Sequence, residues 1–434
     1  MENHTYLGEA QNGFGAVPLA MSRVQRFEHV AVIGASGVGK STLLRSIAAA
    51  DIARGDGLLY LDPHGDEAAA LLDLIPAWRL NHVVFLEIAN SDWPIAFNVL
   101  DCDHADDRAF VADALVSALR DIWFDSMTAA PRMENVLRHA VIALLHVPNA
   151  TLPLIARLLT DDRFRSDVVA RVSNPITRRF FEDRFETWRD GFRGEVIEPI
   201  LTRLDTVLAF PVMLNCLGQH RRTLRLDHAM QGRRIVIADM SRIGDSAAHL
   251  MGALLLARVR TAALARARMA HSQRADFHLI VDELPRFATN SVPALLSEAR
   301  KFQVSMTYST QMLATLSERT RAAVLATTGT LAAFRLGPED GSAIAPKFDE
   351  LHRDFNAARF NDLERGEALI KIGAADVRRV LCAPPPAGYG LADIARRQSQ
   401  RHFARPRAQV EQWLQTSLSS RASSPQKSRR RRAV

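Results

Sequence analysis

The sequence predicts an α/β fold, with a mainly parallel β-sheet, helices on both of its faces and an all-helical insertion. Short apolar runs rich in β-branched residues alternate with helix-like segments in both halves of the chain, which is typical of parallel strands joined by helices. Between about residues 104 and 228 this strand signal disappears and only helical periodicity remains. With 434 residues, 47% of them hydrophobic, the chain can form one large domain carrying such an insertion, or two domains.

The predicted strands are short, and helix-like segments separate most of them. The alternation of apolar and small polar residues is clearest in VSMTYS (304–309). The last two predicted strands are three residues apart, so we expect an antiparallel hairpin at an edge of the sheet. The other predicted strands are HVAVI (29–33), GLLYLD (57–62), HVVFLE (82–87), RRIVIADM (233–240), FHLIV (277–281), TLAAFRLG (330–337), EALIKIG (367–373) and VRRVLCA (377–383).

The predicted insertion consists of amphipathic helices whose stripes are typical of core packing and indicate no ligand site. One apolar helical face is formed by Met133, Val136, Leu137, Ala140, Leu144 and Leu145, and VADALVSALRDIW (111–123) and TLPLIARLLTD (151–161) are similar. We therefore divide the chain into an N-terminal part of the α/β domain (1–103), an all-helical insertion (104–228), a C-terminal part of the α/β domain (229–390) and a basic, partly disordered tail (391–434).

The charge of the chain is concentrated at its C-terminal end. From residue 395 onward there are eleven Arg and Lys and one Glu, which gives this end a net charge of +10. Because the net charge of the whole chain is +7, the residues before 395 carry a net charge of −3. A short helix is expected at residues 406–418, before the polar end SSPQKSRRRRAV. Such a tail can be a solvating extension, or it can contact nucleic acid or an acidic partner electrostatically.

The cysteines and the apolar runs favour a soluble protein of a reducing compartment. The three cysteines, Cys102, Cys216 and Cys382, are widely spaced and form neither a disulfide framework nor a metal-binding pattern. We find no apolar run that approaches the length of a membrane span and no secretory signal at the N-terminus. The expected location is the cytoplasm.

The most specific motif is the stretch HVAVIGASGVGKSTLL (29–44), in which an apolar run leads into Gly34-x-x-x-x-Gly39-Lys40-Ser41 and then into a helix-like segment. This is the strand, glycine loop and helix of a phosphate loop, so we expect ATP and Mg²⁺ to bind here. Lys40 would contact the β- and γ-phosphates and Ser41 would bind the Mg²⁺. A simple glycine turn before a helix would not require the full pattern. The residues expected to bind the nucleotide are Gly34, Ser36, Gly37, Val38, Gly39, Lys40, Ser41 and Thr42.

A second motif, FHLIVDE (277–283), ends a predicted strand with two carboxylates. Taken alone, such an acidic pair is an ordinary solvated strand end or a helix cap. Together with a phosphate loop it supplies what a triphosphatase needs: Asp282 for the metal and Glu283 for the attacking water.

The order of these and further motifs resembles the FtsK/HerA superfamily of ring ATPases, and within it the conjugative coupling proteins of type IV secretion, of the TraG and TraD kind. The resemblance implies a RecA-like P-loop NTPase that uses ATP and Mg²⁺ and forms a homo-hexamer. It also implies largely sequence-nonspecific binding of DNA, a relaxase or secretion-channel proteins as partners, and a place beside the inner membrane reached through such a partner. The resemblance covers about residues 5–390 and rests on HVAVIGASGVGKST, GLLYLDPHGD, PIAFNVL, APRMENVLRHAV, HLIVDELPRFAT, SEARKF and TYSTQ.

The resemblance also assigns roles to both ends of the strand 304–309. Arg300 would be an arginine finger that reaches the nucleotide of a neighbouring protomer, and Gln311 would sense the γ-phosphate or orient water. Without the resemblance, Arg300 and Lys301 would only complement a helix C-terminus, and Gln311 would begin a loop. Asp62 ends another predicted strand, at the sheet edge where ligands collect, and is a secondary candidate for the nucleotide site, although a plain turn is the alternative.

Some features depart from the family pattern. Thr327 and its neighbours in TTGT stand where relatives carry an Asn, which puts a polar sensor there in doubt, and His64 has no assigned role. Membrane-anchored coupling proteins begin with transmembrane helices that are not found here.

Three functions are compatible with these motifs. The leading hypothesis is an ATP-dependent ring motor that moves DNA or a protein–DNA complex. An ATP-switched adaptor that presents cargo to a secretion channel is the alternative, but a switch does not need the complete set of Glu283, Arg300 and Gln311. A monomeric kinase would leave an interface arginine unexplained.

Overall fold

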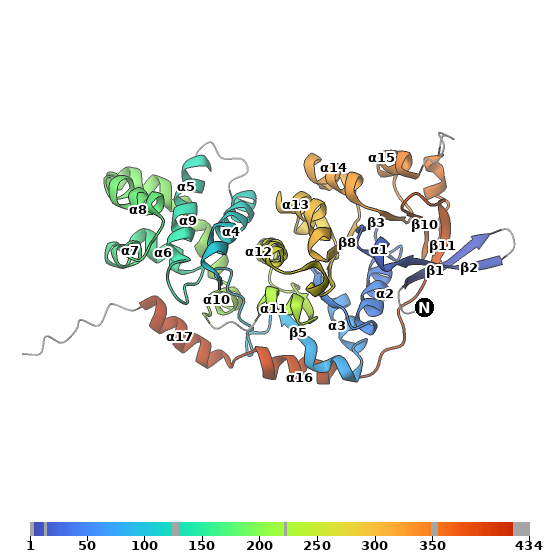
Figure 1. Cartoon of the computed structure of the whole chain (residues 1–434), viewed down its shortest axis with the longest axis horizontal. Helices are drawn as coiled ribbons and strands as arrows, with labels where there is room; N and C mark the ends of the chain where they lie inside the picture. Colours follow the sequence, from blue (N-terminus) through green and yellow to red (C-terminus); the bar gives the residue numbers. More distant parts are fainter. Residues whose placement is uncertain (1–3, 13–14, 124–129, 221–223, 349–354, 420–434) are drawn as a thin grey trace, which may run out of the picture.

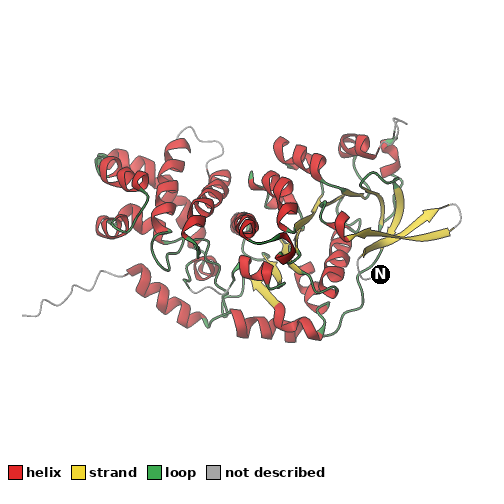
Figure 2. Cartoon of the chain, viewed as in Figure 1, coloured by secondary structure: helices red, strands yellow, loops and turns green. Residues whose placement is uncertain are grey.

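The computed structural model describes residues 4–12, 15–123, 130–220, 224–348 and 355–419, and it confirms the predicted fold class. The described strands form one eleven-stranded sheet in the order β2-β1-β11-β10-β9-β3-β8-β7-β4-β6-β5. Helices lie on both sides of this sheet (Figure 2). The strands are β1 (His4–Asn12), β2 (Gly15–Ser22), β3 (Val30–Ile33), β4 (Gly57–Asp62), β5 (Val83–Glu87), β6 (Ile235–Asp239), β7 (Phe277–Val281), β8 (Val304–Thr310), β9 (Thr330–Ala333), β10 (Glu367–Ile372) and β11 (Arg378–Cys382).

The helices of the described residues are α-helices, labelled α, and 3-10 or π-helical segments, labelled η. The α-helices are α1 (Arg23–Arg26), α2 (Lys40–Ala53), α3 (Asp66–Asp73), α4 (Arg108–Trp123), α5 (Ala130–Leu144), α6 (Leu154–Thr160), α7 (Asp162–Val169), α8 (Pro175–Arg179), α9 (Asp190–Leu208), α10 (Pro211–Leu217), α11 (Leu226–Gln231), α12 (Asp245–Ala265), α13 (Ser291–Glu298), α14 (Glu318–Thr327), α15 (Pro338–Phe348), α16 (Ala392–Phe403) and α17 (Arg407–Ser419). The 3-10 and π-helical segments are η1 (Ala77–His82), η2 (Ala105–Asp107), η3 (Phe180–Phe185), η4 (Arg266–Arg268), η5 (His271–Gln273), η6 (Leu284–Arg286), η7 (Ala299–Phe302), η8 (Leu313–Thr315) and η9 (Ala357–Phe360).

Seven neighbouring strands, from β9 across to β5, are parallel to one another. Every residue of β3, β4, β6 and β7 is buried, as expected for parallel strands covered on both faces. One face packs against α2, α3 and α16, and the other packs against α12 and α13. The parallel arrangement brings the carboxyl ends of these strands to one edge of the sheet.

The remaining strands are antiparallel and extend the sheet beyond β9. The predicted hairpin exists, because β10 pairs antiparallel with β11, but its predicted place at the edge is wrong. β1 pairs with β11, and β2 forms the edge, so that the β1–β2 ribbon projects from the end of the molecule (Figure 1). The sequence of β1 and β2 hides these strands because Gly8, Gly15 and Pro18 interrupt the alternation of apolar and polar residues.

Between β5 and β6 the described residues contain helices and no strand, and this part forms the end of the molecule opposite β1–β2 (Figure 1). The six residues of the predicted apolar face, from Met133 to Leu145, are all buried. One hydrophobic cluster runs without interruption from a face of the sheet into these helices. The helices therefore pack as a continuation of the α/β core.

The helix α12 is the most apolar long helix of the described residues. The stretch Asp245–Arg268, which contains it, is long and apolar enough to cross a membrane, and the pair α9–α10 would qualify only across its bend of 104°. However, 78% of the apolar window of the first stretch is buried inside the protein. α12 lies between α4 and the sheet, in the place of a core helix.

The predicted tail contains more structure than the single expected helix. Helix α17 corresponds to that prediction, but α16 precedes it and packs against β5. The Oγ atom of Ser399 accepts a hydrogen bond of 2.7 Å from the backbone N–H of Phe85, so α16 satisfies a backbone donor of an edge strand. The end predicted to be disordered, SSPQKSRRRRAV (423–434), lies outside the described residues.

Candidate functional site

The carboxyl ends of four adjacent strands, β3, β8, β7 and β4, converge on one cavity. The phosphate loop follows β3, Gln311 follows β8, and the acidic pair follows β7. The LDPHGD segment (61–66) begins with the last two residues of β4 and continues into the turn after it. The cavity has a volume of about 220 Å³. It is lined by Ser36, Gly37, Gly39, Lys40, Ser41, Thr42, His64, Asp282, Glu283, Ser309, Gln311 and Arg365.

The phosphate loop takes the conformation that its glycines allow. Gly37 and Gly39 have φ angles of 74° and 118°, which side chains disfavour, and a Cβ atom on Gly34 would approach Phe334 to 2.7 Å. Lys40 begins α2 and is buried, and its ammonium donates a hydrogen bond of 2.7 Å to the carbonyl oxygen of Ala35. Burial lowers the pKa of Lys40, whereas the carboxylates of the acidic pair raise it.

The two carboxylates after β7 are held by a serine of the TYSTQ motif to which the sequence assigned no role. The hydroxyl of Ser309 on β8 donates to Oδ1 of Asp282 at 2.5 Å and accepts a hydrogen bond from the backbone N–H of Glu283 at 2.8 Å. Glu283 itself has a φ of 58°, in the left-handed region that is uncommon for a residue with a side chain. Ser309 therefore holds the turn at which the side chains of Asp282 and Glu283 diverge.

The carboxylate of Glu283 has a partner on each oxygen. Nε2 of Gln311 donates to Oε1 at 3.1 Å, and Nε2 of His64 lies 3.1 Å from Oε2, so this nitrogen must carry the proton of the bond. Nε of Arg286 lies 3.6 Å from the same Oε2. The structure thus brings Gln311 to the acidic pair, and it gives His64 a contact for which the sequence offered no signal.

Asp62 lies beneath the cavity and does not line it. This side chain is fully buried, and its oxygens accept hydrogen bonds from the backbone N–H groups of His64, at 2.9 Å, and Ala68, at 2.7 Å. Burial raises the pKa of Asp62, and these backbone donors act against that rise. The geometry matches the turn alternative: Asp62 shapes the loop that presents His64 to Glu283.

Arg300 lies at the opposite end of β8 from Gln311. The seven residues of β8 span about 20 Å at roughly 3.3 Å per residue, so the side chain of Arg300 cannot reach the cavity of its own chain. It is 56% exposed, and its guanidinium lies 3.3 Å from a carboxylate oxygen of Glu28. Thr327 stands where relatives carry an Asn, and its hydroxyl donates a hydrogen bond to a backbone carbonyl oxygen of its own helix α14.

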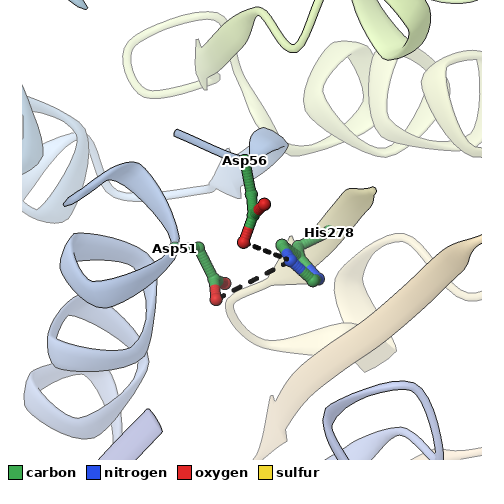
Figure 3. A group of neighbouring side chains, drawn as sticks. All are labelled: Asp51, Asp56 and His278. Carbon is green, nitrogen blue, oxygen red and sulfur yellow. Dashed lines mark ion pairs between the residues drawn. The ribbon is translucent and has the colours of Figure 1, made fainter. Parts of the chain in front are cut away.

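A second group of titratable residues lies away from the cavity, where α2 ends (Figure 3). Nε2 of His278 is 3.8 Å from Asp51 and 3.5 Å from Asp56, a spacing that a metal ion could use. However, Arg26 donates to Asp51 at 2.8 Å, and Arg54 pairs with both carboxylates. Because two arginines already balance the two carboxylates, we interpret the group as a buried ion-pair network that joins α2 to β7.

A larger cavity, of about 490 Å³, lies among α4, α11 and the end of α12. Its charged residues pair with one another, as Arg225 does with Asp227 at 2.7 Å and Arg268 with Asp107 at 2.6 Å. It contains none of the motifs, so its size does not make it the better candidate for the nucleotide.

The comparisons with known proteins agree with this fold. The family model described as "Helicase HerA, central domain" matches residues 8–139, which include β3, the phosphate loop and β4. The unbound conjugative coupling protein TrwBΔN70 matches with a TM-score of 0.63 and 16% identity, over 86% of this chain and 88% of that chain. The fold is that of FtsK/HerA-type P-loop ATPases.

Two further solved structures extend this likeness. The plasmid coupling protein TrwB in complex with ADP and Mg²⁺ matches with a TM-score of 0.65 and 17% identity, over 86% of this chain and 89% of that chain. VirB4 of Thermoanaerobacter pseudethanolicus matches with a TM-score of 0.58 and 13% identity, over 88% and 97%. None of the curated protein sequences is significantly similar to this chain. At these low sequence identities, the likeness establishes that this chain shares the fold of the coupling proteins.

Proposed function

We propose that this chain is a Mg²⁺-dependent ATPase that acts as a ring motor on DNA or a protein–DNA complex, as a coupling protein of conjugation or type IV secretion would. The observation that carries the proposal is the constellation around Glu283. One cavity combines a phosphate loop, the buried Lys40 and a carboxylate held on both oxygens, while the arginine that would complete the site lies on the far side of the same chain.

The residues of the cavity fit ATP and Mg²⁺. Lys40 and the loop amides offer the positive charge and the N–H donors that phosphates require, and α2 begins at the same point. Ser41 and Asp282 line the same cavity and offer the oxygen ligands that Mg²⁺ prefers. The similarity to TrwB, whose structures include a complex with ADP and Mg²⁺, supports this assignment.

Each residue then has a defined task in hydrolysis. Lys40 binds the terminal phosphates, and Glu283 orients the attacking water and accepts its proton. Gln311 holds the Glu283 carboxylate and places an amide beside the position of that water. When bound, Mg²⁺ neutralises negative charge that develops on the phosphate oxygens. Asp282 is kept on the metal side of the cavity by Ser309.

Arg300 acts across a boundary between two copies of the chain. It is too far from its own cavity, and it is exposed at the surface, where Glu28 holds it only weakly because such ion pairs contribute little in water. A neighbouring copy can therefore take up this guanidinium at its own nucleotide without a large loss. The transferred phosphoryl group would then be stabilised by Lys40 from one protomer and Arg300 from the next.

The proposal is tested by ATP hydrolysis measured against protein concentration, with and without DNA. The variants are Glu283→Gln, Arg300→Ala and an equal mixture of both, with Lys301→Ala as the matched control because Lys301 is the adjacent exposed cation. We expect a loss of about 10²–10⁴-fold for Glu283→Gln and about 10³–10⁵-fold for Arg300→Ala.

The equal mixture of the two variants tests whether Arg300 acts on the nucleotide of a neighbouring copy. We expect it to recover part of the rate, because an Arg300→Ala protomer receives the intact arginine of a Glu283→Gln neighbour. A rate per subunit that is independent of concentration, or a fully active Arg300→Ala variant, would contradict the ring. Hydrolysis that DNA does not stimulate would favour the cargo adaptor.

A further inference from the structure

An arginine that no motif marks enters the cavity from the antiparallel side of the sheet. Arg365 lies in the loop between η9 and β10, more than 300 residues after the phosphate loop, and it is among the residues that line the cavity. It thus faces the same space as Lys40, Glu283 and Gln311.

The loop that carries Arg365 is fastened directly to the phosphate loop. The backbone N–H of Gly366 donates to the carbonyl oxygen of Val38 at 2.8 Å, and the carbonyl oxygen of Gly366 accepts from the N–H of Cys382 on β11 at 2.9 Å. Just before Arg365, the side chain of Leu363 is 3% exposed. Arg365 is therefore held at the phosphate loop by bonds on one side and by an apolar anchor on the other.

The contact between the two loops is close. Gly366 has a φ of 86°, and a Cβ atom built on Gly39 would lie 3.4 Å from the Cα atom of Gly366. Because the two backbones touch here, the arginine side chain needs to cover only a short distance to reach a phosphate chain bound by the loop.

The guanidinium of Arg365 is also available. Within the part of the chain that the structure describes, it has no hydrogen-bond or ion-pair partner, and the residue is exposed. Two other arginines near the site are engaged: Arg286 pairs with Glu283 and Asp245, and Arg379, on the neighbouring β11, pairs with Glu367. A guanidinium is a planar, permanently charged fork that matches the oxygens of a phosphate.

We propose that Arg365 binds the phosphate chain of the nucleotide held by its own phosphate loop. The inference rests on the proposed function, since it concerns the same site, and it adds a cation in cis to the Arg300 that a neighbour supplies. The phosphates would then lie between Lys40 on the α2 side and Arg365 on the β10 side.

The test is the dissociation constant of the full chain for a non-hydrolysable ATP analogue and for ADP, both with Mg²⁺. We expect Arg365→Ala to weaken at least one of them about 10- to 100-fold, the range for losing hydrogen bonds between charged partners. Arg365→Lys keeps the charge without the fork and should recover part of the loss. Loss for both ligands places Arg365 on the α- or β-phosphate, and loss for the ATP analogue alone places it on the γ-phosphate.

Two further variants separate the possible failures. Arg378→Ala removes an exposed cation from the adjacent β10–β11 hairpin, outside the cavity, and should bind both ligands as the wild type does. Lys40→Ala should lose binding. If Lys40→Ala loses binding while Arg365→Ala stays within twofold of the wild type for both ligands, the inference about Arg365 is wrong and the proposed function stands. If the wild type binds neither ligand, the proposed function fails together with the inference. Thermal melting of each variant shows that a loss of binding is not a loss of folding.

Discussion

At the scale of single residues, Ser309 organises both carboxylates of the candidate site. It is 1% exposed, and its one hydroxyl serves Asp282 as a donor and the backbone N–H of Glu283 as an acceptor. Glu283 keeps a left-handed backbone that needs such support, because strained conformations persist where surrounding contacts enforce them. A small buried hydroxyl thus determines where the proposed base points.

We predict that Ser309→Ala lowers kcat about 10- to 100-fold, with a smaller change in KM, because the base is misdirected while the phosphate loop stays intact. The unpaired buried N–H should also cost about 1–3 kcal/mol of unfolding free energy. Thr307→Val is the matched control on the same strand. The hydroxyl of Thr307 is buried and, within the described residues, unpartnered, so this isosteric change should lower neither kcat nor the unfolding free energy. Equal effects of the two substitutions on kcat would show that the hydrogen bonds of the Ser309 hydroxyl have no specific role in directing Glu283.

The residues found by sequence reasoning and the residues it missed differ in how they are connected. The phosphate loop and the acidic pair are contiguous motifs, so their spacing alone revealed them. Ser309 and His64 act on Glu283 from 26 and 219 residues away in the sequence, and Arg365 arrives through a loop contact. Each of these positions depends on which strands are neighbours in the sheet, and a single sequence does not carry that information.

At the scale of elements, the position of the proposed finger segment η7 depends on how α13 and β8 are joined. His29, at the start of β3, is buried and connects them. One ring nitrogen donates to the carbonyl oxygen of Leu296 at 2.9 Å, and the other accepts from the N–H of Met306 at 3.0 Å. Both bonds require a neutral imidazole. Burial is the main cause that lowers the pKa of His29 to about 4; the hydrogen bond to the carbonyl oxygen of Leu296 acts against it, and the nearby Arg26 and Arg300 act with it.

This pKa makes stability depend on pH with a definite sign. Because the folded pKa lies below the ordinary value of about 6.5, the unfolded chain binds the proton more readily, so the contribution is complete above pH 6.5 and is lost as the pH falls towards 4. We predict that the unfolding free energy, measured by urea titration, falls by about 3 kcal/mol from this residue between pH 7 and pH 4.

The matched variant is His29→Gln, whose amide can donate and accept in the same places but does not titrate. It should show a shallower decline between pH 7 and pH 4 than the wild type. The decline should not vanish, since burial lowers the pKa of His139 to about 4 as well. A variant whose pH dependence equals that of the wild type would show that His29 is not the titrating group.

The elements that the sequence predicted are those with strong local patterns. The buried parallel strands are short apolar runs, which single them out wherever they occur. β1, β2 and α16 were missed because they are stabilised by contacts with distant partners: β1 by β11, and α16 by the edge of β5. The residues of β1 and β2 show little alternation, and those of α16 are mostly polar.

At the scale of the whole molecule, α16 and α17 run from the sheet to the helices that lie between β5 and β6 (Figure 1). α16 bonds to β5 through Ser399, and Arg396 pairs with Glu87 at 2.7 Å. α17 packs on α10, where Trp413 stacks on His220 with 4.3 Å between the ring centres. Since the hydrophobic cluster also continues from the sheet into the helices, the predicted division into an α/β domain and an insertion does not imply separate folding units.

We therefore predict a single unfolding transition in urea. Far-ultraviolet circular dichroism, which reports on all helices, and tryptophan fluorescence, which reports on Trp123 and Trp188 among the helices, Trp413 on α17, and Trp78 and Trp93 near the sheet, should give the same midpoint. Leu414→Ala, which empties a buried position of α17 beside Gly218, should lower this shared midpoint by the equivalent of about 2–5 kcal/mol. If the change instead splits the curve, so that the helices unfold before the sheet, the two parts fold independently. A ring motor of the proposed kind needs the coupled outcome, because force from ATP hydrolysis at the sheet edge reaches the helical end only through contacts that do not yield separately.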